Sequence, residues 1–572
     1  MSHPWTSVNR QLCIAVLLAA IAVLPYANSL TADFTFDDLT VIRNNPAVQR
    51  EPAQRLWNNV YLPGFLYRPL TMLTYAANAR LSTGPFYYHV VNVALHASVT
   101  VASYGLARQL LASEAIAFAA AVLFAVHPCH TEAVTSIVGR AELLAAFFVV
   151  ASLLAFCRAL KAEGALRVFW WAISLGAMGA GLLAKESAFT TIALIPVLHW
   201  HRLRQAAIRQ RVRVTLPYLA VGLAYLGLRL AVVGSMGLPT PPVALDNPLA
   251  HVAPTVRIAT ALVVLAQYAS LFAIPLQLSA DYSFNAIPLV LSPFDSRLLL
   301  AMVVLGCGAA VVMAGCRRVP GLATSAWLGI VPLALTANLL FPIGTIKAER
   351  LLYLPSLGGC LLVAMLSARA LRDRRRAYNA LLLIVVMSFA GRTWARNYDW
   401  QDNLALFKAT VATSPGSAKA HYNAAVALQQ HRRLDEALAH YRRALEIYPK
   451  YAGAALGIGR VYALRGDDDR ALSWYEEALR SDWRLADVHL EIGLIHEKQR
   501  AYTRAEAAFR EGLANDPRNP VLRVNLSAVR LAQGDRWEAL SLLDDLDHLP
   551  ATSLAEFETV AQARREIEEA AQ

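Results

Sequence analysis

The sequence predicts an all-α protein with a polytopic helical membrane domain at residues 1–400 and an α-solenoid of about four repeats at 401–550. A helical tail at 551–572 follows. Hydrophobic residues make up 56% of the 572 residues and charged residues 16%, a balance that fits membrane helices. Beyond residue 400 the apolar stretches give way to a polar sequence with a 34-residue period.

About twelve apolar stretches in the first part approach the roughly 20 residues that a helix needs to cross a bilayer. They lie at 11–30, 89–110, 114–127, 138–158, 168–184, 187–201, 214–233, 257–278, 297–316, 322–342, 351–368 and 377–393. The first stretch lacks a small-residue cleavage site. We therefore expect a retained helix there rather than a signal peptide.

The basic residues predict the orientation of these stretches. Arginine and lysine cluster at 158–167, 202–213 (Arg204 among them), 317–318 and 369–376. Each cluster should be cytoplasmic, so an even number of crossings must separate neighbouring clusters. Three stretches lie between 213 and 317, so one of them should not span. We choose 257–278, which carries Arg257, Gln267 and Pro275. This predicts eleven crossings, a cytoplasmic N-terminus and repeats on the outer face.

Charge and cysteine usage exclude other classes of protein. The net charge is +12, but the basic residues lie at helix ends, so no nucleic-acid partner is expected. The six cysteines include no CxxC pair, so neither a disulfide framework nor a zinc site is expected. We predict a multi-pass protein of the bacterial inner membrane with periplasmic repeats, or of the endoplasmic reticulum membrane if the chain is eukaryotic.

The repeats begin near Ser417. Columns spaced by 34 residues hold Ala437, Ala471, Ala505 and Ala539; Ala425, Gly459, Gly493 and Ser527; and Tyr441, Tyr475 and Phe509. Small residues let paired helices approach closely and aromatic residues fill the space between pairs, which is the tetratricopeptide pattern. The repeats should hold an extended peptide or a partner protein. A purely structural cap is the alternative.

Polar segments between the apolar stretches fall on the predicted outer face. In the first, Asp37 and Asp38 are adjacent. Two carboxylates at a membrane surface can act as general base toward an acceptor hydroxyl. They can also hold a divalent cation, Mg²⁺ or Mn²⁺, that screens a phosphate. A solvated turn or helix cap is the structural alternative. No other metal site and no other cofactor are predicted.

The next polar segment contains His127, His130 and Glu132. Without a third well-spaced ligand this is a weak zinc pattern, so we favour hydrogen bonds to a substrate. Arg140 and Glu142 open the following helix and can pair with each other or with this segment.

Two further polar segments carry charge. Lys185 and Glu186 interrupt an apolar hairpin, where they can neutralise one another or face a substrate. Arg350 follows Glu349 at the outer end of a predicted membrane helix. A guanidinium there can bind a lipid phosphate through two parallel hydrogen bonds. A snorkelling anchor is the alternative.

Taken together, these segments resemble the transmembrane and tetratricopeptide-repeat O-mannosyltransferases and their bacterial relatives. The resemblance covers nearly the whole chain. It is carried by residues 36–38, 44–45, 67–71, 89–96, 127–134, 137–144, 185–186, 281–283 and 341–356. Ser187 and Ala188 follow the Lys-Glu pair where eukaryotic members have Gln-Gly. The repeat array is also shorter than theirs.

The resemblance implies a C-type glycosyltransferase fold. It also implies transfer of a sugar, expected to be mannose, from a polyprenyl-phosphate carrier to Ser or Thr of proteins on the outer face. The base of related enzymes maps to Asp37 or Asp38, and Arg350 becomes the candidate for the lipid phosphate. The other positions expected to bind substrate are Arg68, His89, His127, His130, Glu132, Arg140, Glu142, Lys185, Glu186, Asp281 and Glu349.

The expected partners are the lipid-linked sugar, membrane lipid, and an acceptor protein or peptide held by the repeats. One alternative keeps the fold and changes the acceptor to a cell-envelope glycan or lipid. The other is a non-catalytic membrane scaffold with protein-binding repeats.

Overall fold

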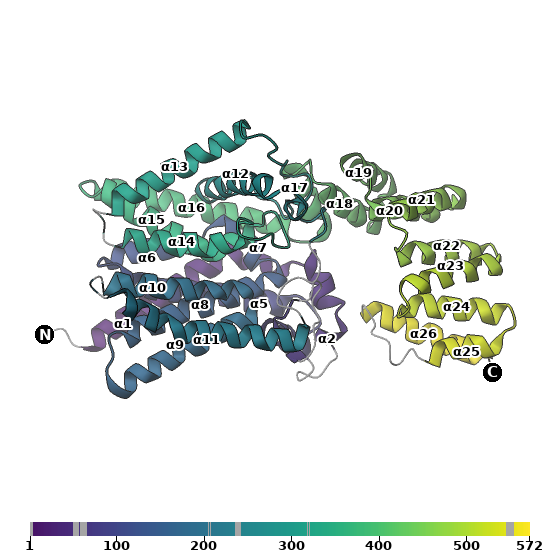
Figure 1. The fold of residues 1–572 in the computed structure, drawn as a ribbon, viewed down its shortest axis with the longest axis horizontal. Helices are drawn as coiled ribbons and strands as arrows, with labels where there is room; N and C mark the ends of the chain where they lie inside the picture. The colour runs from purple at the N-terminus through teal and green to yellow at the C-terminus, as the bar shows by residue number, and fades with distance from the viewer. Residues whose placement is uncertain are drawn as a thin grey trace. The chain divides into compact units, whose positions relative to one another are not determined.

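The computed structural model of the chain describes residues 4–49, 56–57, 66–203, 205, 207–234, 242–316, 319, 321–544 and 554–571. Its regular elements over these residues are helices, which confirms the all-α prediction (Figure 1). The chain divides into two compact units. The membrane unit comprises residues 1–38, 52–283 and 287–409, and the repeat unit comprises 39–51, 284–286 and 410–572. Two short segments of the predicted membrane domain therefore belong to the repeat unit.

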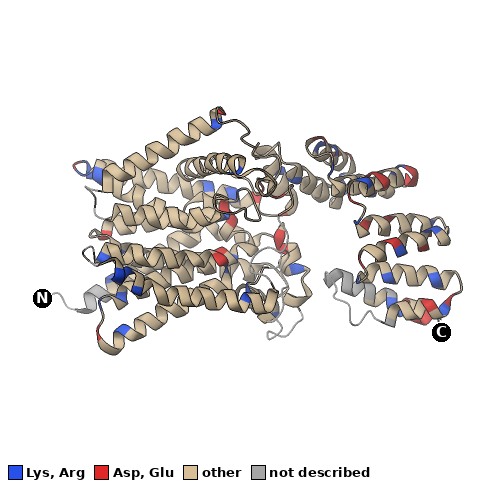
Figure 2. Ribbon diagram, viewed as in Figure 1, with Lys and Arg blue, Asp and Glu red and all other residues tan. Residues whose placement is uncertain are grey.

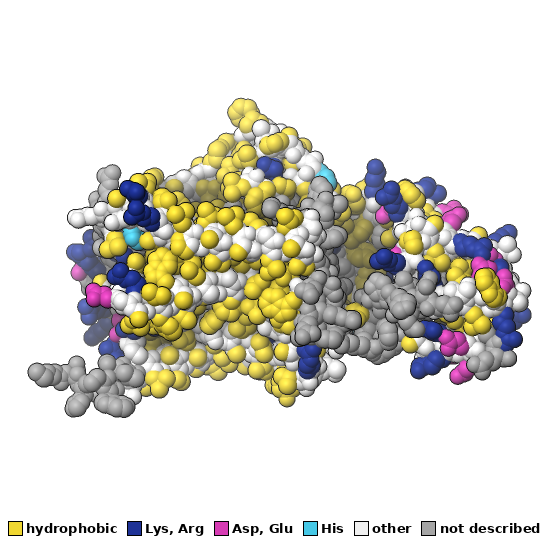
Figure 3. Space-filling view, turned by 60° about the horizontal axis from the view of Figure 1, so that its bottom comes forward, with side chains coloured by type: hydrophobic (Ala, Val, Ile, Leu, Met, Phe, Trp, Pro, Cys, Tyr) yellow, Lys and Arg dark blue, Asp and Glu magenta, His cyan; other side chains and the backbone are white. Residues whose placement is uncertain are grey.

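Nine helices among the described residues are long and apolar enough to cross a bilayer. They are α1 (Pro4–Val23) continued by η1 (Leu24–Thr31), α5 (Phe86–Leu110), η4 (Ile137–Gly139) with α8 (Arg140–Ala159), α9 (Gly164–Ala184), α11 (Ile208–Val233), α12 (Pro254–Ala273), α13 (Ser296–Cys316), η7 (Glu349–Leu352) with α15 (Tyr353–Ala370), and α16 (Arg375–Asp399). Hydrophobic side chains cover most of the face of this unit seen in Figure 3, as expected of a surface in contact with lipid.

The remaining predicted stretches form shorter or broken helices. α6 (Glu114–Ala125) is followed, after a bend of 51°, by η3 (Pro128–His130) and α7 (Thr131–Val134), and together they pass the same test. α10 (Thr190–Arg202) and α14 (Leu322–Thr336) are shorter. One further helix, α4 (Pro69–Leu81), lies in the predicted first outer loop.

The bend after α6 brings α7 against the start of α8. A Cβ atom at Gly139 would lie 2.2 Å from the carbonyl oxygen of Ala133. Only glycine permits this approach of the two backbones. The close contact places the polar segment 127–142 at one end of the helices, where the other polar loops also lie.

The flanks of α12 differ from those expected of a spanning helix. Before it, Asn247 donates to the carbonyl oxygen of Ile343 (2.7 Å). After it, the Ser279 amide donates to Glu349. A 20-residue helix separates its ends by about 30 Å. Here both flanks contact one short stretch, 343–349. By length and composition alone α12 could cross, so the crossing count stays a prediction.

Charges are unevenly distributed over the membrane unit. Figure 2 shows Lys and Arg gathered at the end that holds the N-terminus, whereas carboxylates lie mostly toward the opposite end. Of the basic residues that set the predicted orientation, Arg204, Arg317 and Arg318 lie outside the described residues.

The repeat unit consists of consecutive helix pairs. Its helices are α18 (Ala418–Gln430), α19 (Leu434–Ile447), α20 (Ala452–Leu464), α21 (Asp468–Ser481), α22 (Ala486–Lys498), α23 (Tyr502–Asn515), α24 (Pro520–Ala532), α25 (Arg536–Asp544) and α26 (Leu554–Ala571); α17 (Asn403–Thr413) precedes them. A Cβ atom at Gly459 would lie 2.3 Å from the Tyr475 ring, and one at Gly493 would lie 2.2 Å from the Phe509 ring. The small and aromatic columns therefore pack against each other, as the tetratricopeptide pattern predicts.

Candidate active site

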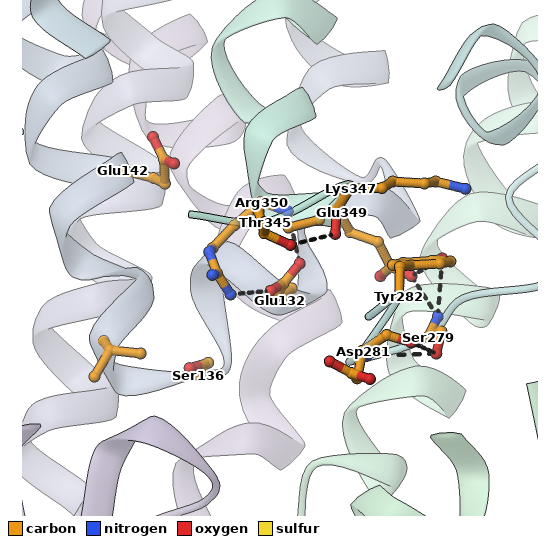
Figure 4. A network of polar contacts seen from close by, with 12 residues as sticks. Glu132, Ser136, Glu142, Ser279, Asp281, Tyr282, Thr345, Lys347, Glu349 and Arg350 are labelled. Carbon is orange, nitrogen blue, oxygen red and sulfur yellow. Dashed lines mark hydrogen bonds and ion pairs between the residues drawn. The ribbon is translucent and has the colours of Figure 1, made fainter. Parts of the chain in front are cut away.

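Charged side chains from separate polar loops meet at one end of the membrane unit. Arg350, in η7, pairs with Glu132, in α7, through its guanidinium and also donates its backbone amide to that carboxylate (2.7 Å). Figure 4 shows this pair with the Glu142 side chain on the same side of the loop. The Arg350 side chain is 28% exposed and that of Glu132 only 2%. The Arg350 side chain therefore stays partly exposed, whereas the Glu132 side chain is buried in the ion pair.

Two further ion pairs complete the cluster. Lys185 pairs with Glu142, and both are largely buried. Glu186 accepts from Arg68 (2.8 Å) and, on its other oxygen, from Arg229 of α11 (3.3 Å). Burial raises the pKa of Glu186, but Arg68 more than offsets this, so the pKa lies below its ordinary value. The ion pairs of Lys185 and Glu186 are therefore with residues of other elements.

The adjacent aspartates have different surroundings. Asp38 is fully buried and accepts from the backbone amides of Val138 (2.8 Å), Ile137 (3.3 Å) and Thr35 (3.2 Å). Burial raises its pKa to about 7, although these amides pull it down. Asp37 is half-buried, and its charge interacts with that of Arg350. Asp38 therefore ties the segment before α4 to the start of η4, whereas Asp37 is related to the cluster through its charge interaction with Arg350.

The aspartate pair does not fit a divalent cation. Both Asp38 oxygens already accept backbone N–H groups, whose positive ends oppose a metal ion. The described residues contain no group of three or more His, Cys, Asp or Glu side chains placed to hold one. The alternative of Mg²⁺ or Mn²⁺ at Asp37 and Asp38 therefore gains no support from the geometry.

The three predicted histidines lie among packed helices. His127 Nε2 is 3.0 Å from the carbonyl oxygen of Phe272. His130 Nε2 is 2.7 Å from Ser356 Oγ, and His89 Nε2 is 3.1 Å from the carbonyl oxygen of Ala32. All three are buried. Burial and bonding to protein groups favour a structural role over the predicted contact with substrate.

Arg140 is bonded to protein groups on neighbouring helices. Its guanidinium is fully buried and donates to Asn92 Oδ1 (2.8 Å), Asn78 Oδ1 (2.6 Å) and the carbonyl oxygen of Tyr88 (2.9 Å). It does not pair with Glu142, which is bonded to Lys185. These bonds join the start of α8 to α4 and α5, and the contact of Arg140 with substrate stays a prediction.

Asp281 and Glu349 lie beyond the Arg350 loop. In Figure 4, Glu349 and Tyr282 are on the side facing Ser279, whereas Arg350 turns toward Glu132. Glu349 accepts from the Tyr282 hydroxyl (2.9 Å), and Asp281 accepts from Ser283 Oγ (2.6 Å). Both carboxylates are buried. They organise the loop around 279–283 next to the cluster, and their contact with substrate stays a prediction.

Arg229 is a further member of the cluster, which the sequence did not predict. It is a single arginine in the apolar stretch 214–233, and an ionisable residue inside a membrane helix is itself a signal of function or pairing. Its partner, Glu186, is 43 residues away in the sequence, so only the fold reveals the pair.

The family model described as "Protein O-mannosyl-transferase TMTC, DUF1736" matches residues 240–309, and tetratricopeptide-repeat models match 417–482 and 485–520. The chain is 30% identical to Protein O-mannosyl-transferase Tmtc3 of Drosophila melanogaster, 30% to Protein O-mannosyl-transferase F38B6.6 of Caenorhabditis elegans and 31% to Protein O-mannosyl-transferase TMTC1 of Homo sapiens.

These alignments cover 81%, 76% and 78% of this chain and 57%, 63% and 56% of the relatives. The chain thus spans less than two thirds of the length of each. Among solved structures, a tetratricopeptide-repeat protein of Thermus thermophilus is 25% identical, with a TM-score of 0.26, over 30% of this chain and 91% of its own.

Proposed function

Because this chain belongs to the TMTC family, we propose that it is an integral membrane protein O-mannosyl-transferase. In this proposal it moves mannose from a polyprenyl-phosphate carrier to Ser or Thr hydroxyls of proteins on the outer, periplasmic or luminal, face of the membrane. The observation that carries the proposal is the partly exposed Arg350 side chain, which pairs with Glu132 and whose charge interacts with that of Asp37. In this proposal Arg350 binds the donor phosphate and Asp37 is the base.

The charge balance of the cluster supports a donor with a single phosphate. The cations Arg68, Lys185, Arg229 and Arg350 face the carboxylates Asp37, Glu132, Glu142 and Glu186. Four charges of each sign balance before any donor binds. One added negative charge is accommodated at lower cost than the greater charge of a diphosphate.

The mechanism we propose is a single displacement with inversion at the anomeric carbon. Asp37 accepts the proton of the acceptor hydroxyl, whose oxygen attacks the anomeric carbon while the bond to the phosphate oxygen breaks. The leaving phosphate gains negative charge, which the Arg350 guanidinium stabilises. Asp38 stays with its backbone donors and holds the loop that carries Asp37.

We also propose the eleven-crossing topology, with α12 lying along the outer interface. Contact of both its flanks with residues 343–349 supports this arrangement. The crossings would then be α1, α5, the bent pair beginning at α6, α8, α9, α10, α11, α13, α14, α15 and α16. An odd number with a cytoplasmic N-terminus puts the charged cluster and the repeats on the outer face.

A deletion strain of the source organism tests the function. We expect hexose on Ser and Thr of envelope or luminal proteins to disappear and to return with the wild-type chain, but not with Asp37→Asn. Unchanged protein glycans with an altered envelope polysaccharide or glycolipid would mean a different acceptor. Unchanged glycans of every kind, with mislocalised proteins, would mean a scaffold.

A further inference from the structure

Residues 347–349, which precede Arg350 in its loop, are held by side chains and backbone of one segment of the chain. The Gln267 side chain accepts from Lys347 Nζ (3.3 Å). The Tyr268 hydroxyl bonds to Ala348. These holders, together with Ser279 and Tyr282 on Glu349, lie within 240–309, the segment that the TMTC model matches. The match assigns no role to these residues, whereas their contacts converge on 347–349.

Tyr268 makes the most specific of these contacts. Its hydroxyl accepts from the Ala348 amide (3.0 Å) and donates to the Ala348 carbonyl oxygen (3.2 Å). Ala348 is extended, with φ −153° and ψ 143°. In that conformation the N–H and C=O of a residue point to the same side, and a neighbouring strand normally satisfies both. Here one phenol hydroxyl takes the place of the strand.

The contact is buried and close to Arg350. Tyr268 is 1% exposed and Ala348 6% exposed. Without the hydroxyl, a backbone donor and a backbone acceptor would remain buried without these partners, which strongly disfavours the observed loop conformation. The Arg350 amide, two residues further on, bonds to Glu132. The backbone conformation at Ala348 therefore determines the point from which the Arg350 side chain extends.

We propose that Tyr268 is a positioning residue that fixes the Ala348 backbone so that Arg350 presents its guanidinium to the donor phosphate. It does not touch the substrate; it acts through Arg350. The placement of the loop stands on the geometry alone. Its consequence for donor use rests on the proposed function, so two separate measurements are needed.

The first measurement is hydrogen exchange on the full chain in detergent. Tyr268→Phe removes one oxygen and leaves the ring. We expect the Ala348 amide, followed in a peptide covering 345–352, to exchange at least about 10-fold faster, the effect of losing one net hydrogen bond. The matched control is Tyr218→Phe. Tyr218 is also fully buried and bonded through its hydroxyl, but to Ser174. Unchanged exchange at Ala348 in Tyr268→Phe overturns the proposal, whether or not the chain has transferase activity.

The second measurement is a double-mutant cycle on kcat/KM for polyprenyl-phosphate mannose. Tyr268→Phe alone should lower it about 10-fold, and should add little once Arg350 is replaced by Lys, because both changes disturb the same contact. Tyr218→Phe should combine with Arg350→Lys as an independent change. If the fold-losses in kcat/KM from Tyr268→Phe and Arg350→Lys multiply in the double variant, Tyr268 acts independently of Arg350 and the proposal fails. Absence of transfer by the wild type would count against the proposed function, while the exchange measurement would still decide the placement of the loop.

Discussion

Asp37 and Asp38 show how far the surroundings of a residue change its chemistry. Both are carboxylates in one short loop, and the sequence offers no reason to separate them. The fold buries Asp38 against three backbone amides and leaves Asp37 half-buried near Arg350. Our account therefore assigns proton transfer to Asp37 and loop placement to Asp38.

Replacing each aspartate should separate these roles. Asp37→Asn should lower transfer by about 10²- to 10⁴-fold, the usual cost of losing a positioned base, with an unchanged midpoint of thermal unfolding. Asp38→Asn places an amide NH₂ or a single acceptor where two oxygens accept N–H groups, so it should lower both activity and the midpoint. Assays of transfer and thermal unfolding on purified chains check this. A stable, fully active Asp37→Asn variant would contradict the assignment.

The raised pKa of Asp38 predicts a pH dependence of stability. Its pKa is about 7 in the folded chain against an ordinary value of 3.8, so the folded chain binds the proton more tightly than the unfolded chain. The contribution of Asp38 to the free energy of unfolding is then greatest below pH 4 and falls as the pH rises to 7. The difference in unfolding midpoint between wild type and Asp38→Asn, followed from pH 4 to 8, should shrink with pH. A constant difference would contradict it.

Arg350 should contribute to donor binding through the parallel N–H donors of its guanidinium as well as through its charge. Arg350→Lys keeps the charge but loses parallel hydrogen bonds, so use of the donor should weaken by about 1.5–3 kcal/mol, and Arg350→Ala should be worse. The measurement is a donor titration in detergent with Arg372→Lys, at an exposed arginine elsewhere in the chain, as the control. Unchanged donor dependence with reduced stability would identify Arg350 as a structural anchor.

Among the elements, the apolar stretches predicted the membrane helices, and the columns spaced by 34 residues predicted the repeat helices. Twelve stretches correspond to described helices, although α10 begins three residues after its stretch and α14 ends six residues before the end of its stretch. α4 was missed because its sequence, 69–81, has no long apolar run. The roles of Arg140 and the histidines could not be predicted, since their partners come from distant helices.

The small and aromatic columns of the repeats give an element-scale prediction. Gly493→Ala would put a methyl group 2.2 Å from the Phe509 ring, so the repeats should lose about 1–3 kcal/mol, as in other overpacked cores. Gly453→Ala, whose Cβ would lie 3.4 Å from the Tyr451 ring, should be neutral or stabilise α20 by up to about 1 kcal/mol. Limited proteolysis of the repeats during a temperature series compares them. Equal behaviour of the two variants would contradict the packing argument.

At the scale of the whole molecule, the account depends on which loops share a face of the membrane. Positive charge and parity predicted eleven crossings, and the contacts around α12 agree with a segment that does not span. Sequence alone could only choose among the three stretches between 213 and 317, because the contacts that distinguish α12 join residues about 100 positions apart in the chain.

Single cysteines test this topology. Val243 precedes α12 and Ser292 follows it, and both are exposed, whereas Ser283 is buried and a poor probe. In a chain with the exposed Cys13 and Cys307 replaced by serine, Val243→Cys and Ser292→Cys should both react with an impermeant reagent from outside. Arg374→Cys should react only from inside. Labelling of Val243→Cys and Ser292→Cys from opposite sides would show that α12 crosses.

The most direct test of the central claim is transfer by the purified full chain. Polyprenyl-phosphate mannose with an isotopic label in the sugar is incubated with a Ser/Thr-containing protein from the same membrane compartment, and the product is examined by mass spectrometry. The account predicts labelled mannose on Ser or Thr with the wild type, and a loss of about 10²- to 10⁴-fold with Asp37→Asn. Absence of labelled protein with the wild type, or undiminished labelling with Asp37→Asn, would contradict it.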